Sequence, residues 1–288
     1  MTTIQGRGFG LQVNADVLMM LLRVTLGVIF IIGGIKLAFL GETSALVASY
    51  INPAKGWISA VFADKITQTL GVSLGAFLRS QGLVEILLGL LMILGLGSRI
   101  VAVILGLMFW SFTVANPVVG EIRLSRDIAL MGLCFAVALS GGGAWSVDRR
   151  VWGTPSMWSQ HRNTILLLMR LSLAYTLLAS AIFASGPFAN HLNTTLPVVV
   201  VLLLGVLLAV GVRPHWIMGL LGVWMLYVVG MSLAAKGFYF GLDSAKRELG
   251  FLLASVVYTL LGPDHWPWSQ ATSAPQAVVQ NEYATSRA

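Results

Sequence analysis

Charged residues inside long apolar runs are the residues of this chain whose types and positions could carry chemistry. Lys36 and Glu85 each lie within such a run, and Arg126-Asp127 opens another. A charge at membrane depth is costly, so each one predicts either a buried partner or a functional site. Counted along their helices, Lys36 and Glu85 lie on the order of 20 Å from the same membrane face. We therefore expect Lys36, Glu85, Arg126 and Asp127 to converge near the opposite, outer face.

Two kinds of chemistry fit these groups. Glu85 could accept a proton beside a quinol hydroxyl, or Lys36, Arg79 and Arg126 could form a cationic pocket for an oxyanion. The structural alternative is that Lys36 extends its ammonium toward the membrane surface while Glu85 pairs with Lys36 or Arg126. Ion pairs of this kind fix helix packing without catalysing anything. Catalytic roles at Lys36 and Glu85, and substrate binding by Arg79, Arg126 and Asp127, are therefore hypotheses.

Metal and haem chemistry are not expected. The four histidines, at 161, 191, 215 and 265, fall at loops or helix ends rather than at the middle of an apolar run, where haem ligation would need them. No ligand spacing supports a metal site. The single cysteine, Cys134, excludes an intramolecular disulfide and a CxxC redox pair. Nucleotide fingerprints are absent from the sequence, so a self-contained redox enzyme is not predicted.

The composition places the chain in a membrane. Of its 288 residues, 57% are hydrophobic and only 10% are charged, too few to cover the core of a water-soluble fold. The net charge of +7 is spread over helix ends and loops, so nucleic acid is not an expected partner. Eight apolar runs are long enough to span, or nearly so: 17–39, 81–97, 100–119, 126–141, 164–184, 196–212, 216–235 and 248–262. Glycines in these runs, among them Gly33-Gly34 and Gly89, predict close packing between helices.

The sequence also contains an internal repeat. Two apolar runs 121 residues apart begin with an arginine and a carboxylate and end with a glycine and a tryptophan: Arg126-Asp127 to Gly141 and Trp145, then Arg247-Glu248 to Gly262 and Trp266. We expect an all-α integral membrane protein of two four-helix units, 1–148 and 164–268, related by a pseudo-two-fold axis along the membrane normal. Phe183 and Val199 are the counterparts of Lys36 and Glu85, so only the first unit keeps the charged pair.

The connection between the units sets the expected orientation. This linker, 149–163, contains Arg149, Arg150 and Arg162, and short basic connections stay in the cytoplasm. With four helices per unit, both termini then lie in the cytoplasm as well.

Two segments lie outside the repeat. The insert 40–80 carries apolar residues at helical spacing from Trp57 to Leu70, with a start signal at Asn52-Pro53, which predicts an amphipathic helix on the outer membrane surface. This helix could be packed on the bundle, could cover a site, or could bind a partner. Residues 269–288 are small and polar and are expected to form a disordered tail.

The motifs of residues 18–148 resemble the DoxX family. The resemblance rests on four segments: Leu22-Arg23 with Gly34-Ile35-Lys36-Leu37, Gly82-Leu83-Val84-Glu85, Gly95-Leu96-Gly97-Ser98-Arg99, and Arg126-Asp127 with Gly141-Gly142-Gly143-Ala144-Trp145-Ser146-Val147-Asp148. The second half resembles a degenerate copy of the same unit. This family includes proteins similar to the membrane subunit of thiosulfate:quinone oxidoreductase, which works with a partner subunit. Two fused units and the long insert depart from the usual single unit.

The resemblance implies a quinone-linked or redox-associated component of a bacterial or archaeal plasma membrane, with Lys36, Glu85, Arg126 and Asp127 as its polar set. We expect membrane lipid and a redox subunit at the outer face as partners and no covalent cofactor; quinone is the candidate ligand, and whether it binds stays open. A homo-oligomer stays open. The rival functions are a noncatalytic scaffold that recruits a redox or stress-response partner, and a small-solute carrier, which the scarcity of polar residues at mid-membrane disfavours.

Overall fold

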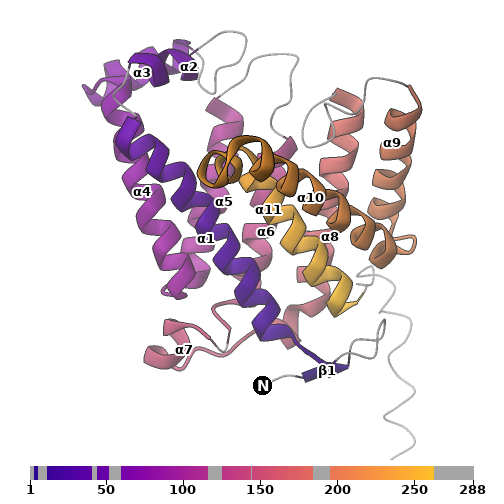
Figure 1. Cartoon of the computed structure of the whole chain (residues 1–288). Helices are drawn as coiled ribbons and strands as arrows, with labels where there is room; N and C mark the ends of the chain where they lie inside the picture. Colours follow the sequence, from indigo (N-terminus) through magenta and orange to yellow (C-terminus); the bar gives the residue numbers. More distant parts are fainter. Residues whose placement is uncertain are drawn as a thin grey trace, which may run out of the picture.

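The computed structural model describes residues 3–5, 12–40, 44–51, 60–115, 125–143, 145–183 and 195–262. These residues are almost entirely helical (Figure 1). Near the N-terminus a short antiparallel pair joins β1 (Thr3–Gln5) to β2 (Gln12–Asn14), with Ile4 opposite Val13. An all-α fold was expected, because three-residue strands are too short to leave an alternating pattern that could be recognised in the sequence.

A long helix overlaps each of the eight expected apolar runs. The helices are α1 (Ala15–Leu40), α4 (Leu74–Leu94), α5 (Ser98–Ala115), α6 (Ser125–Ser140), α8 (Trp158–Phe183), α9 (Thr195–Val210), α10 (Pro214–Lys236) and α11 (Phe238–Leu261). The largest difference is at α11, which begins ten residues before the expected start at 248. Its first turns carry Asp243, Lys246 and Arg247, which lie upstream of the expected apolar run 248–262.

Four of these helices, α1, α4, α8 and α10, are long and apolar enough to cross a membrane. Three shorter apolar stretches lie in α5, α6 and α9. Such helices support a multi-pass membrane protein, because each can satisfy its backbone hydrogen bonds within the hydrocarbon.

The long helices pack around one continuous apolar core. Within the two halves of the chain, α1 packs against α4, α5 against α6, α8 against α9, and α10 against α11. These pairs are joined by α6 against α8 and by α1 against α11. The core includes buried residues from all eight helices, and the rings of Phe30 and Phe109 lie 4.7 Å apart between α1 and α5.

Glycines bring α1 and α4 into backbone contact. A Cβ atom on Gly27 would lie 2.7 Å from the carbonyl oxygen of Gly89, and one on Gly34 would lie 2.6 Å from that of Gly82. Real Cβ atoms do not approach other atoms so closely, so only glycine fits at these positions. The two contacts fix an antiparallel register in which Glu85 of α4 lies level with Ile31 of α1.

The glycine-rich motifs close the end of the bundle at which α1 begins. Arg23 donates to the carbonyl oxygens of Gly142 and Trp145, the latter at 3.0 Å. The carboxylate of Asp148 accepts from the backbone N–H groups of residues 97 and 98, at 2.6 and 2.8 Å, and so caps α5. These motif residues therefore have a structural role. Asp148 belongs to α7 (Val147–Trp152), a short helix that overlaps the start of the expected linker 149–163 (Figure 1).

The insert differs in part from its predicted form. It contains two short helices, α2 (Ser44–Tyr50) and α3 (Ala60–Leu70), at the end of the bundle away from α7 (Figure 1). The expected start at Asn52-Pro53 and the residue Trp57 lie outside the described residues, as does the expected tail 269–288. Residues 74–80 belong to α4, because the apolar span continues upstream of its expected start at 81.

Candidate functional site

Ionisable residues from α1, α4, α6 and α11 meet at the end of the bundle that carries α2 and α3. We call them the ionic network, defined by their side chains: Lys36, Glu85, Asp127, Asp243, Lys246 and Arg247, together with the amide of Gln81. Lys36 lies in the last turns of α1, Asp127 in the first turn of α6 and Asp243 in the first turns of α11. The antiparallel order of the helices places all three at the same end.

Asp243 joins two lysines. Its Oδ2 atom lies 3.2 Å from Lys36 Nζ, and its Oδ1 atom lies 2.8 Å from Lys246 Nζ. The Lys36 side chain is 41% exposed, whereas those of Asp243 and Lys246 are 16% and 18% exposed. The contact with Lys36 spans 207 residues of sequence, so it ties the first long helix to the last.

Glu85 lies deeper, with 5% of its surface exposed. Gln81, one turn earlier on α4, donates to its Oε1 atom at 2.9 Å. Gly33 of α1 faces the other carboxylate oxygen: a Cβ atom added there would lie 3.1 Å from Glu85 Oε2 and 3.4 Å from Lys246 Nζ. Those two atoms are therefore at most 6.5 Å apart. The absence of a side chain at Gly33 leaves the space in which the carboxylate and the ammonium face each other.

Asp127 and Arg247 form the most buried ion pair described. Arg247 Nε donates to Asp127 Oδ1 at 2.7 Å, and Arg247 Nη2 lies 3.4 Å from Oδ2. The Asp127 side chain is only 1% exposed. This pair connects α6 to α11, across 120 residues of sequence.

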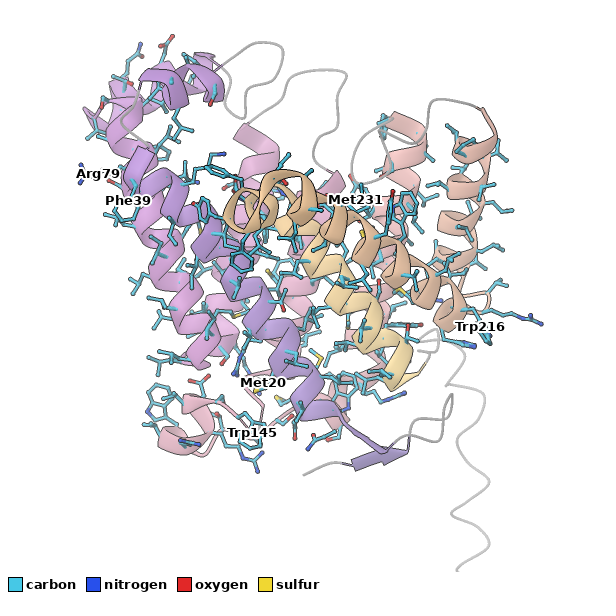
Figure 2. All side chains as sticks on the ribbon, in the orientation of Figure 1. Met20, Phe39, Arg79, Trp145, Trp216 and Met231 are labelled. Atoms are coloured by element: carbon cyan, nitrogen blue, oxygen red, sulfur yellow. The ribbon has the colours of Figure 1, made fainter. Side chains whose placement is uncertain are left out.

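Two further site residues were predicted, Arg79 and Arg126. Arg79 is exposed on the outside of α4 (Figure 2). The side chain of Arg126 lies outside the described residues, although its backbone belongs to α6. Lys36, Glu85 and Asp127 do gather at one end, but the partner of Lys36 is Asp243.

Charge balance distinguishes the two chemistries raised by the sequence. Within the network, the cations Lys36, Lys246 and Arg247 are matched by three carboxylates, at 85, 127 and 243. Among these described side chains, which do not include that of Arg126, no positive charge is in surplus to attract an oxyanion. The pairing of Lys36 with Asp243 and the exposed position of Arg79 favour proton handling by Glu85 over an oxyanion pocket built from Lys36, Arg79 and Arg126.

Sequence reasoning did not identify Gln81, Asp243 and Lys246 as site residues. The repeat offered a signal for α11, because Arg247-Glu248 recurs in register with Arg126-Asp127. A search for partners of Lys36 near that motif would have reached Asp243 and Lys246.

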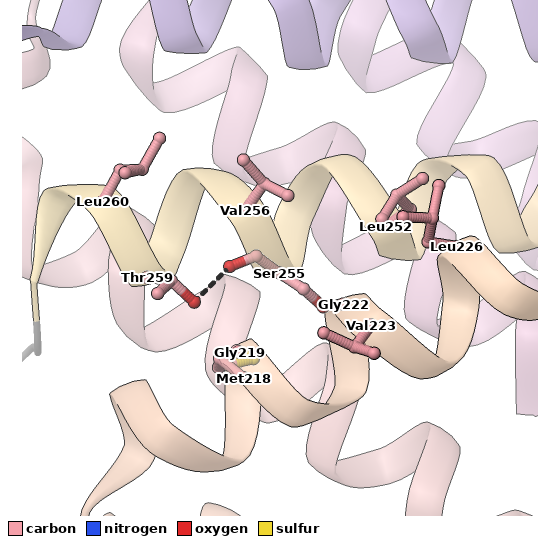
Figure 3. A pocket seen from close by; sticks show the side chains of 10 residues that line it. All are labelled: Met218, Gly219, Gly222, Val223, Leu226, Leu252, Ser255, Val256, Thr259 and Leu260. Atoms are coloured by element: carbon pink, nitrogen blue, oxygen red, sulfur yellow. Dashed lines mark hydrogen bonds between the residues drawn. The ribbon is translucent and has the colours of Figure 1, made fainter.

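The described cavity lies elsewhere, between α10 and α11 (Figure 3). It has a volume of about 270 Å³ and an almost wholly apolar lining. On α11 it begins at Leu252, one turn beyond Glu248. Ser255 and Thr259 are its polar lining residues, and the Thr259 hydroxyl donates to the Ser255 carbonyl oxygen. A cavity with so few convergent polar groups carries no chemistry of its own.

Neither metal ligands nor relatives identify the site. Within the described residues, no three His, Cys, Asp or Glu side chains gather as a metal site. Comparisons of the chain with protein-family models, curated proteins and solved structures give no match. A function has to be inferred from the geometry of the ionic network.

Proposed function

We propose that this chain is a membrane-embedded, quinone-reactive or anchoring subunit of an oxidoreductase complex, as its resemblance to the DoxX family implies. The observation that carries the proposal is the placement of Glu85. Its carboxylate is buried among helices, accepts a hydrogen bond from Gln81 and faces the ammonium of Lys246. A buried ionisable group of this kind, inside a helix of spanning length, is a functional hypothesis by default.

The residues around Glu85 fit the needs of a quinone head group. A quinone takes up two electrons and two protons on reduction, and the partner subunit would supply the electrons. Gln81 and Lys246 offer N–H donors for a carbonyl oxygen, and Glu85 can give a proton and take one back. The neighbouring faces of α1 and α4 are apolar and would exclude water from the ring. Arg126 and Asp127 lie at the start of α6, at the same end of the bundle.

The proposal includes eight membrane spans in two parallel four-helix units with cytoplasmic termini. The packing supports this arrangement: α1 pairs with α4 and α8 with α9, while α5 pairs with α6 and α10 with α11. The contacts between the units, α1 with α11 and α6 with α8, also exchange under a two-fold rotation. Arg149 and Arg150 of α7 are exposed, as a cytoplasmic basic connection requires.

The test combines Glu85→Gln and Lys36→Ala with Lys236→Ala as a matched control, because Lys236 is an exposed lysine at the end of α10. Native membranes are solubilised in mild detergent, and the tagged chain is purified. Co-purifying proteins and extracted lipids are identified by mass spectrometry, and quinone reduction is measured in the membranes. We expect Glu85→Gln to lower quinone reduction by about 10²-fold or more, as removal of a general acid does. Unchanged reduction and unchanged assembly in both variants would refute the proposal.

A noncatalytic scaffold is the second candidate, and the charge balance of the network favours it. Matched ion pairs hold helices together without any substrate. On α3, Asp64, Lys65 and Gln68 are exposed and available to a partner. Replacing residues 44–70 by a short Gly-Ser linker leaves α4 intact, because that helix begins at Leu74. A scaffold predicts that this replacement abolishes the association with the partner while Glu85→Gln leaves it unchanged.

A further inference from the structure

The ionic network forms a polar chain that leads from the end of the bundle to Glu85. The chain runs from Lys36 to Asp243 at 3.2 Å and from Asp243 to Lys246 at 2.8 Å. The ammonium of Lys246 then faces Glu85 across the space above Gly33, at most 6.5 Å away. The Lys36 side chain is 41% exposed, those of Asp243 and Lys246 are 16% and 18% exposed, and Glu85 is buried.

The depths of Lys36 and Glu85 along their helices give the polar chain a direction. In the register fixed by the glycine contacts, Glu85 lies level with Ile31, five residues before Lys36 on α1. Five residues at 1.5 Å rise put Glu85 about 7 to 8 Å deeper than Lys36. Lys36 itself is four residues from the end of α1. The chain therefore connects a group near the helix ends to a carboxylate within the bundle.

The other groups around Glu85 do not offer a second such path. Gln81 of α4 is an amide and does not titrate. Asp127 of α6 is held by Arg247, and Glu248 of α11 is 3% exposed. On the far side of Glu85, toward α7, α4 continues with Leu88 and Met92, both buried in the apolar core. Within the described residues, the titratable groups that connect Glu85 to the α2 and α3 end are therefore those of α11, Lys246 and Asp243.

We infer that Glu85 exchanges its proton with water at the α2 and α3 end of the bundle through Lys246 and Asp243, which act as relay residues. The Lys246 ammonium gives a proton to the Glu85 carboxylate. It regains one from the Asp243 carboxyl, which is protonated by water at the helix ends. The reverse sequence releases a proton, so no other reactant is needed. The flexible stem of Lys246 covers the remaining gap by rotation. This route rests on the proposed role of Glu85 in proton transfer.

Infrared spectroscopy of the full chain in lipid nanodiscs tests the route without any quinone. The carbonyl stretch of a protonated carboxyl shifts when H₂O is replaced by D₂O, and Glu85→Gln assigns the band. We expect the exchange rate of this band to fall by about 10²-fold or more in Asp243→Asn and in Lys246→Gln, as loss of a positioned proton carrier does. Asp64→Asn, an exposed change on α3, is the matched control and should exchange at the wild-type rate.

The outcomes separate the route from the proposed function. Wild-type exchange rates in both relay variants would overturn the inference. The inference would also be overturned if the protein showed no Glu85 band at any pH at which it stays folded. If Asp243→Asn or Lys246→Gln does not fold, Asp243→Glu and Lys246→Arg provide the comparison. Asp243→Glu keeps a carboxyl group and should keep fast exchange. Lys246→Arg introduces a guanidinium, which does not release its proton, and should slow the exchange. If exchange is slowed in the relay variants but the wild-type protein never reduces quinone, the proton route would stand and the quinone function would be refuted.

Discussion

The ion pair between Asp127 and Arg247 gives the strongest stability prediction. Its carboxylate side chain is 1% exposed, and the guanidinium side chain is 18% exposed. Removing one partner of a buried pair leaves an uncompensated charge, which costs about 3 to 5 kcal/mol. We expect Arg247→Met to lie at the upper end of this range, because it leaves the fully buried Asp127 charged. Asp127→Asn should cost less, because the remaining arginine is partly exposed.

A double-mutant cycle isolates the interaction. Asp127→Asn combined with Arg247→Met removes both charges, so the double variant should be less destabilised than the sum of the single variants, by about 1 to 3 kcal/mol of coupling. The free energy of unfolding is measured by reversible denaturation in detergent micelles. Arg150→Met, which removes an exposed arginine from α7, is the control and should change stability by less than about 0.5 kcal/mol.

Two results would refute this reasoning. Additive single effects would show that the two residues do not stabilise each other, despite their separation of 2.7 Å. Equal costs for Arg247→Met and Arg150→Met would show that burial of the carboxylate does not determine the penalty. Either result would also remove the basis for treating α6 and α11 as electrostatically joined.

Two further predictions concern the structural motifs. Asp148→Ala leaves two N–H groups at the start of α5 without their acceptor. We expect a loss of about 3 kcal/mol of stability, at about 1.5 kcal/mol or more for each bond to a charged group. Thermal unfolding in detergent measures this loss, and Asp148→Asn should cost less. Gly82→Ala places a Cβ atom 2.7 Å from the Gly34 carbonyl oxygen and should cost about 1 to 3 kcal/mol, because it forces α1 and α4 apart. The control is Gly230→Ala, whose Cβ atom meets no other atom within 4 Å and which should be neutral in the same assay.

The positions of the long helices could be predicted from the sequence because apolar runs of spanning length have few alternatives to a helix. The start of α11 could not. Hydropathy counts a charge as a cost wherever it lies, and it carries no information about partners. The partners of Asp243 and Arg247 come from α1 and α6, 207 and 120 residues away. A buried charge that has a distant partner looks like a loop residue in a local window.

The candidate site was predictable in part for the same reason. Lys36, Glu85 and Asp127 were recognisable as charges within or next to apolar runs, and the structure brings them to one end of the bundle. Which charge pairs with which depends on helix packing. The register of α1 against α4 is set by glycines that permit backbone contact, and it decides that Glu85 faces Gly33 rather than Lys36.

The long sequence separation of the ion pairs has a consequence for biosynthesis. Asp127 is synthesised well before its partner exists, because 120 residues must still be translated before Arg247 appears. At about 5 to 20 residues per second, this delay is on the order of 6 to 24 s. During that time the nascent chain holds an acidic group at the start of α6 and a basic group near the end of α1 with neither contact formed. The packing of the first four long helices is thus incomplete until α11 has been synthesised.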